Sequence, residues 1–255
     1  EWEIGTAGAT TLVMQTVLLP LALVSGTSTI QIHGGTHVPN SPPAHYLRDV
    51  YIPLLLEMGI EAAMFIGAYG WVPEGDGTLT AQVEGGAKLH GRDLRERGDL
   101  ERVFGTALAS NLPSHIPQRM ANRAINLLGS VDSFDAPLDI RPRRESGLST
   151  GAGIFLTVEY SNGRGGFGVL GRKGMPSEVV AGDAVTALLS FHDSGAAIDA
   201  HLADQLVIPL ALAEGPSAFT TPAITEHLRT NIDTVRHFVD REIRVDEARY
   251  FVTFA

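Results

Sequence analysis

The chain has 255 residues, of which 44% are hydrophobic and 19% charged. This is enough apolar material for one large domain or two ordinary ones, and it excludes disordered, collagen-like and coiled-coil proteins. Cysteine is absent, which excludes disulfides and thiolate metal sites and fits a reducing compartment, so we expect a cytoplasmic protein. The net charge of −10 argues against a protein that coats long nucleic acids, but not against a pocket for one terminal phosphate.

The first residues carry no targeting signal. Glu1-Trp2-Glu3 is acidic and lacks the basic start of a signal peptide. The longest apolar stretch, residues 12–24, is interrupted by Gln15 and Pro20, and it is shorter than the ~20 residues that span a bilayer. We therefore expect no membrane partner. Because the initiator methionine is missing, we also expect that Glu1 is not the natural start.

Hydrophobic periodicity predicts alternating helices and strands over the first part of the chain. The first helix is apolar on nearly every side, which predicts burial between layers, and Pro20 should kink or end it. The elements expected here are a helix over 10–24, a strand over 28–33, a helix over 43–58, and strands over 61–68 and 78–83.

The pattern changes near Leu89, where a densely charged segment begins. A strand–helix–strand–strand–strand–helix set follows, over 101–109, 117–128, 137–142, 153–160, 167–170 and 178–191. The chain then ends with a helix over 199–212, a strand over 217–220, a helix over 225–239 and two closing strands. We predict an α+β fold, in which a large domain (1–95 and 194–255) carries a smaller inserted α+β domain (96–193).

Two glycine-containing loops are candidate ligand platforms. The loop Gly5–Thr11 runs into a helix, whose exposed N–H groups and dipole favour a phosphate. The loop Gly34–Pro43 follows a strand and is stiffened by prolines. Tight packing explains the first loop equally well, and an ordinary connector explains the second. Gln15, the long polar side chain within the apolar helix, must bond either to neighbouring backbone or to a bound group, because burying an unpaired amide costs several kcal/mol.

Polar side chains also mark two later helices. His201, Asp204 and Gln205 stand at i, i+3 and i+4 and project from one helix face, as in a pocket wall. They make a poor metal site, because no second histidine or carboxylate completes it. His227 and Asn231 border the apolar stripe of the last helix. The helix N-terminus keeps such a histidine neutral and attracts phosphate, although a capping or core role is the ordinary interpretation of a lone histidine there.

Taken in order, the segments GTAGATTLVMQTVLLP, GGTHVPNSPP, HLADQLVIPLALA and TEHLRTN resemble the RNA 3′-terminal phosphate cyclase family. The resemblance runs from about Gly5 to Val239 and is loosest in the predicted insert, where FGVLGRKGMPSE matches best. It implies a large domain of repeated α+β units, with helices packed on mixed sheets and a smaller α+β domain inserted. The family's glycine-rich N-terminal segment is not present in this sequence, and we expect that it precedes this region.

The resemblance also implies a reaction and its site. A histidine attacks the α-phosphate of ATP, AMP passes to an RNA 3′-phosphate, and the 2′-hydroxyl displaces AMP to form a 2′,3′-cyclic phosphate. His227 matches this nucleophile, and the implied partners and cofactors are RNA 3′-phosphate ends, ATP and Mg²⁺ or another divalent cation. Which residues bind the metal, and the oligomeric state, are left open.

The implied nucleotide-binding residues are Gln15, Pro42, His201, Asp204 and Gln205. Pro42 is expected to contact the base, Gln15 and Gln205 to hydrogen-bond to the nucleotide, and Asp204 to orient His227 or a bound group. His201 stands where the family often has tyrosine. Gly168 stands where an aromatic residue often packs on adenine, with Phe167 beside it.

Two alternatives remain. A non-catalytic relative acting in ribosome assembly would lack the nucleophilic histidine, whereas His227 is present. An enolpyruvyl-type transferase would need several arginine and lysine residues to clamp an anionic substrate, and the motifs above carry almost none.

Overall fold

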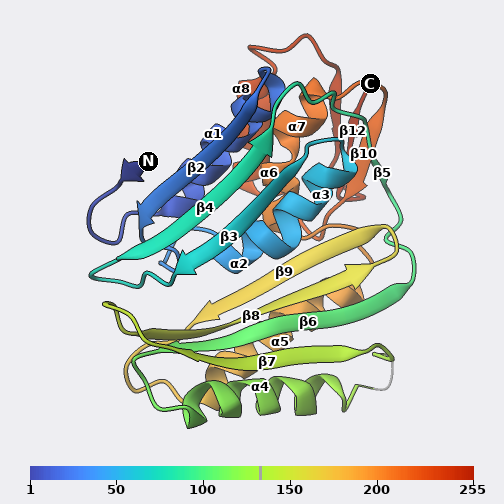
Figure 1. The fold of residues 1–255 in the computed structure, drawn as a ribbon. Coiled ribbons are helices and arrows are strands. Elements are labelled where there is room, and N and C mark those ends of the chain that lie inside the picture. Colours follow the sequence, from blue (N-terminus) through green and yellow to red (C-terminus); the bar gives the residue numbers. More distant parts are fainter. Residues whose placement is uncertain (132–133) are drawn as a thin grey trace.

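Three four-stranded sheets and the helices packed on them make up the fold (Figure 1). A computed structural model describes residues 1–131 and 134–255. The combination of helices with mixed parallel and antiparallel sheets confirms the predicted α+β class. Within the described residues, no helix combines the length and apolarity needed to cross a lipid bilayer.

The first sheet has the order β1-β2-β4-β3 and carries helix α1 on its inner face. Only β1 runs parallel to its neighbour. β1 was missed because a strand of two residues has no periodicity to detect. The bounds are β1 Trp2–Glu3, α1 Thr10–Leu23, β2 Thr27–Gly34, β3 Ala62–Ala68 and β4 Gly77–Glu84.

Helix α1 packs on the sheet with one stripe only. Met14, Leu18 and Ala22 are buried, whereas Leu12 is 46% exposed and Leu23 40%. The prediction that this helix is buried between layers was therefore wrong, because a helix lying on one sheet face buries only the side chains that face the sheet. Pro20 lies within the helix, which continues to Leu23.

The helix expected over 43–58 forms with a π-helical turn in its middle. Its parts are α2 Ala44–Tyr46, the π turn η1 Leu47–Tyr51 and α3 Ile52–Glu57. One face of this helix is buried, with Tyr46, Val50, Leu54 and Met58 along it.

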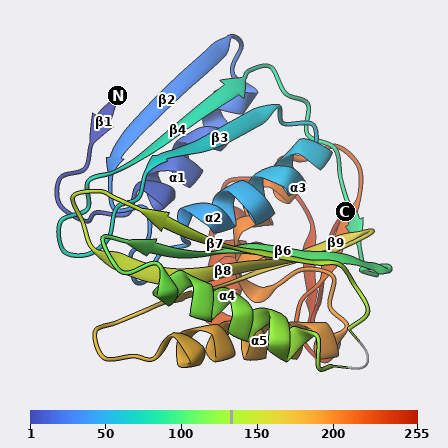
Figure 2. The same cartoon turned by 60° about the horizontal axis from the view of Figure 1, so that its bottom comes forward.

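The second sheet has the order β7-β6-β8-β9, with helices α4 and α5 covering the face turned away from the first sheet (Figure 2). Its elements are β6 Leu100–Ser110, α4 His115–Leu128, β7 Leu138–Glu145, β8 Gly151–Tyr160, β9 Gly163–Leu170 and α5 Ser177–Ser194. All six predicted elements are present, each a few residues longer than predicted, and β7 begins at Leu138 rather than at residue 137.

The third sheet has the order β11-β12-β10-β5 and stands beside three short helices. The predicted helix over 199–212 is broken at Leu206, because Pro209 has no N–H to donate to the carbonyl of Gln205. The last helix ends at Val235 rather than Val239. The bounds are β5 Asp93–Leu94, α6 Ala200–Gln205, α7 Val207–Leu212, β10 Ser217–Thr220, α8 Glu226–Val235, β11 Ile243–Asp246 and β12 Phe251–Phe254.

The buried side chains form two main cores. One draws on residues between Met14 and Leu94 and again between Ala197 and Phe254, and the other lies between Val103 and Ala196. The division into domains at residues 95/96 and 193/194 stays a prediction.

Candidate active site

His227 is exposed on the first turn of α8. Thr225 caps this helix, and its Oγ1 accepts a hydrogen bond from the Leu228 N–H at 3.1 Å. Leu228 and Ile232 anchor the opposite face of the helix in the core. The imidazole is therefore accessible at the end of the helix where the backbone dipole favours an anion.

An amide–carboxylate contact joins α8 to α6. Asn231 Nδ2 donates to the Asp204 Oδ1 at 2.8 Å and to the Asp204 backbone carbonyl at 3.0 Å. Asn231 lies four residues after His227, so the two share a helix face and His227 lies one turn from this contact. No hydrogen bond joins Asp204 to His227 within residues 1–131 and 134–255, so orientation of a bound group by Asp204 stays a prediction.

Gln205 follows Asp204 and carries an unpaired oxygen. Its Oε1 is buried and has no hydrogen-bond partner within the described residues. A buried acceptor left unpaired costs ~1–3 kcal/mol. This atom is therefore suited to accept a hydrogen bond from an amino or hydroxyl group of a ligand.

His201 is exposed on the first turn of α6, and its ring forms a T-shaped contact with the Tyr46 ring at a centroid distance of 6.5 Å. Asp199 caps this helix through hydrogen bonds from the N–H groups of His201 and Leu202. The structure thus gathers His201, Asp204 and Gln205 on α6, with His227 on the neighbouring helix.

A groove separates the loop that contains Pro42 from strands β8 and β9. It has a volume of about 170 Å³ and is lined by Val38, Pro39, Asn40, Ser41, Pro43, Phe155, Gly168 and Leu170. Pro42 is half-buried between two of these residues in sequence. Polar and apolar surface line the groove in about equal parts.

The space beside Gly168 is occupied by Phe155, its partner across the strands. A Cβ on Gly168 would lie 2.9 Å from the Phe155 ring and 3.2 Å from Pro43 Cγ. Phe167 does not take that place, because its ring packs on Phe191 of α5 at 5.5 Å. The aromatic group at the groove is therefore Phe155. Its place there follows from its pairing with Gly168 across the strands, which the sequence alone does not reveal.

Gln15 lies on α1, the helix that packs on the first sheet. Its side chain is half-buried on α1, and no hydrogen bond joins it to another group in the part of the chain that the structure describes. Its role toward a nucleotide stays a prediction.

The loop Gly5–Thr11 packs closely against the backbone of Gly35. Thr10 donates to the Gly35 carbonyl from both its N–H, at 2.9 Å, and its Oγ1, at 2.8 Å. The Gly35 N–H donates in return to Gly8 O at 2.8 Å. These bonds hold the loop against the start of the Gly34–Pro43 loop.

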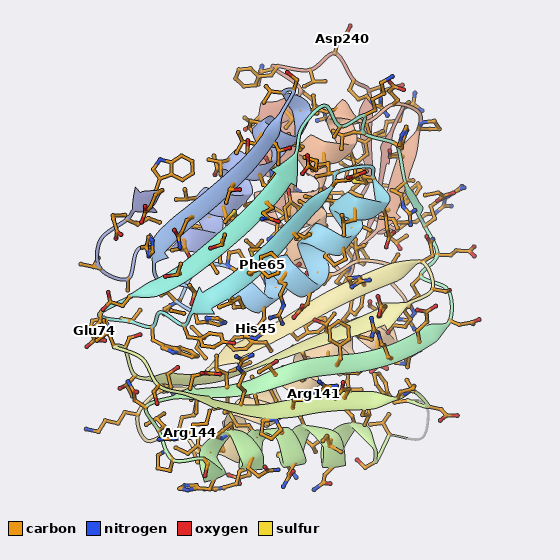
Figure 3. The ribbon with its side chains drawn as sticks, in the orientation of Figure 1. His45, Phe65, Glu74, Arg141, Arg144 and Asp240 are labelled. Carbon is orange, nitrogen blue, oxygen red and sulfur yellow. The ribbon has the colours of Figure 1, made fainter. Side chains whose placement is uncertain are left out.

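Sequence inspection missed a buried chain of polar side chains behind the groove. Thr36 Oγ1 lies 2.8 Å from His37 Nδ1, and His37 Nε2 lies 2.8 Å from His45 Nδ1. Phe155 packs on both imidazoles at 4.7 Å. His45 lies where the first sheet meets the second (Figure 3). No pattern in the sequence pairs a loop residue with a helix residue eight positions later.

Both imidazoles are held neutral at physiological pH. Burial, aided by the charge of Arg48, lowers the pKa of His37 to about 3. Burial also holds the pKa of His45 well below its usual range, with contributions from His37, Arg48 and Arg143. They can therefore act as hydrogen-bonding groups but not as cations for a phosphate.

Known proteins resemble this chain over nearly its whole length. A family model described as RNA 3′-terminal phosphate cyclase matches residues 1–245. A protein of Trichormus variabilis named RNA 3′-terminal phosphate cyclase is 49% identical over 251 residues, which cover 98% of this chain and 71% of that protein. Proteins with the same name from Methylococcus capsulatus and Archaeoglobus fulgidus are 48% and 37% identical, over 92% and 96% of this chain and 65% and 71% of their own lengths. The chain belongs to the RNA 3′-terminal phosphate cyclase family.

Proposed function

We propose that this protein converts the 3′-phosphate of an RNA end into a 2′,3′-cyclic phosphate at the expense of ATP. The observation that carries the proposal is the exposed His227 at the N-terminus of α8, one helical turn from the Asn231–Asp204 contact. A nucleophile at that position is accessible, and the helix end favours the phosphate that it attacks. Membership of the cyclase family supports the same reaction.

The reaction takes place in three transfers. A His227 ring nitrogen forms a bond to the α-phosphorus of ATP, and pyrophosphate leaves. An oxygen of the RNA 3′-phosphate then attacks this phosphorus, AMP passes to the RNA, and the imidazole is released. Finally the 2′-oxygen bonds to the 3′-phosphorus, AMP leaves, and the 2′-hydroxyl proton passes to solvent.

Several residues have groups suited to hold the nucleotide. The unpaired Oε1 of Gln205 accepts a hydrogen bond from it, and Asp204 orients a bound group. Pro42 contacts the base at the groove edge, while Gln15 and His201 complete the set proposed from the family resemblance. Mg²⁺ or another divalent cation accompanies ATP and offsets phosphate charge.

Two properties of the whole protein belong to the same proposal. We place it in the cytoplasm, where RNA ends and ATP occur and where a chain without cysteine loses no structural disulfide. RNA binding should be directed to the end and only weakly sensitive to salt, because the net charge is −10.

The test is transfer of label from α-³²P-ATP with Mg²⁺ to the protein, read after denaturing electrophoresis. His227→Asn should abolish the label, because the nucleophile is gone. His237→Asn, at another exposed histidine just beyond α8, should keep it. Labelling of all three proteins would exclude His227 as the nucleophile, and labelling of none would favour a non-catalytic binding relative or an enolpyruvyl-type transferase.

A further inference from the structure

Asp199 is a buried carboxylate with more hydrogen-bond donors than a helix cap requires. It is 2% exposed. Its Oδ1 accepts from the N–H groups of His201 at 2.8 Å and Leu202 at 3.0 Å. The Tyr46 hydroxyl donates to it at 2.9 Å, and the Gly166 N–H donates to Oδ2 at 3.0 Å. Two donors are enough to cap α6, so the other two need a separate explanation.

Those two donors come from the elements on either side of the groove. Tyr46 lies in α2, which begins directly after Pro43. Gly166 lies on β9, two residues before Gly168. Asp199 itself begins α6, which carries Asp204 and Gln205. One carboxylate therefore connects the proline loop, the groove strand and the helix that presents the unpaired Gln205 oxygen.

The local packing admits this connection because Gly166 has no side chain. A Cβ there would lie 2.6 Å from Tyr46 Cδ2 and 2.7 Å from Val50 Cγ2. The absence of a side chain lets the Tyr46 ring lie directly against β9, with its hydroxyl at Asp199. Burial and the neighbouring Asp199 hold the pKa of Tyr46 well above its usual range, so its hydroxyl keeps the proton that it donates.

A second contact supports the same junction. The Arg164 N–H donates to the Ala197 carbonyl at 2.9 Å, and the Ile198 N–H donates to the Thr220 carbonyl at 3.2 Å. The backbone before Asp199 thus bonds to β9 on one side and to β10 on the other. Asp199 has little freedom to move without moving β9.

We propose that Asp199 is a positioning residue for the nucleotide. By fixing α6 relative to α2 and β9, it sets the distance between Gln205 and the Pro42 groove, and so the affinity for ATP. The proposal rests on the function proposed above, because it assumes that a nucleotide bridges these elements. Asp199 contacts the protein and not the substrate, so it acts through α6 and Tyr46.

The test compares Asp199→Asn with the wild type. Asparagine keeps an oxygen for the α6 cap, but its amide N–H₂ replaces the oxygen that accepts from the Gly166 N–H, which places two donors together. Tyr46→Phe removes one donor and leaves the carboxylate with its three N–H groups. Asp193→Asn, at an exposed position near the end of α5, is the matched control.

Three measurements distinguish a positioning role of Asp199 from a purely structural one. They are the Kd for labelled ATP by equilibrium dialysis, the rate of protein labelling at saturating ATP, and amide exchange of residues 200–205. We expect Asp199→Asn to raise the Kd about tenfold and to speed exchange in α6, with the labelling rate within threefold of wild type. Tyr46→Phe should raise the Kd about threefold, and Asp193→Asn should change none of the three.

An unchanged Kd in a folded Asp199→Asn protein would overturn the proposal, even with faster exchange. If Asp199→Asn does not fold, an unchanged Kd in Tyr46→Phe would overturn it. A wild type that binds ATP without becoming labelled would contradict the proposed function, while the Kd comparison would still decide the role of Asp199.

Discussion

The Nε2 atom of His37 lies 2.8 Å from the Nδ1 atom of His45, and both side chains are almost completely buried. One proton is shared at this contact, so one ring donates and the other accepts. The Gly70 N–H donates to Thr36 Oγ1, whose hydroxyl faces two acceptors, His37 Nδ1 at 2.8 Å and the Gly70 carbonyl at 3.5 Å. The shorter contact favours donation to His37 Nδ1, and His37 Nε2 then donates to His45 Nδ1.

This pair predicts that the protein loses stability in mild acid. Both folded-state pKa values lie below the ordinary value of 6.5, so well below that pH the unfolded chain binds up to two more protons than the folded chain. The contribution of this pair to the free energy of unfolding should therefore level off about one pH unit above 6.5 and should fall as the pH is lowered. The slope should approach about 2.7 kcal/mol per pH unit for two groups.

Urea unfolding between pH 5 and pH 7.5 measures this slope. His37→Asn should reduce it by about half, since one titrating group is removed. His237→Asn, at an exposed position, should leave it unchanged. An equal slope in His37→Asn and wild type would contradict the assignment.

Gly166→Ala should destabilise the protein by about 1–3 kcal/mol, because the new methyl group overlaps the Tyr46 ring. Gly182→Ala on α5 is the matched control, since no atom outside its own helix lies within 4 Å of the added carbon. That change should stabilise by roughly 0.5–1 kcal/mol. Thermal unfolding of the two variants should give shifts of opposite sign.

Gln205→Met should weaken ATP binding without loss of stability. The change removes an unpaired buried oxygen, so the free energy of unfolding should stay equal or rise by ~1 kcal/mol. The Kd for ATP should rise about tenfold. Gln118→Met on the exposed face of α4 should change neither quantity by a comparable amount. A destabilised Gln205→Met protein would indicate that Gln205 has a structural partner instead.

Asn231→Asp should reduce labelling by ATP about tenfold, or ~1.4 kcal/mol. It replaces two donated hydrogen bonds with repulsion between two carboxylates, which displaces the helix face that carries His227. Thr230→Asp adds the same charge at an exposed position on α8 and should label normally. Equal loss in both variants would point to net charge rather than to the Asp204 contact.

Periodicity was sufficient to predict the long elements, including α1, β2 and all six elements from β6 to α5. It failed where pairing or chain chemistry decides the structure. Strands β1 and β5 have two residues each, and they are strands only because they pair with β2 and β10. The break at Leu206 follows from Pro209. It was not predicted, because the apolar run of α7 continues the helical pattern through this proline.

The candidate site was predicted from motif order rather than from single residues. The structure brings His201, Asp204 and Gln205 together with the helix of His227. The role of Gln15 stays a prediction. The roles of Asp199, His37 and His45 had no sequence signal, because each depends on partners brought together by tertiary packing.

The larger core is built from two separate stretches of the chain, and this determines the order in which the two cores can form during translation. Its first contributors precede Leu94 and its last follow Ala197, whereas the core between Val103 and Ala196 is encoded by one continuous stretch. The nascent chain can thus complete the later-starting core first, before the residues after Ala197 that finish the larger core are made. The Asp204–Asn231 contact one turn from His227 forms only when α6 and α8 have both left the ribosome, after every residue of the core between Val103 and Ala196 has been made.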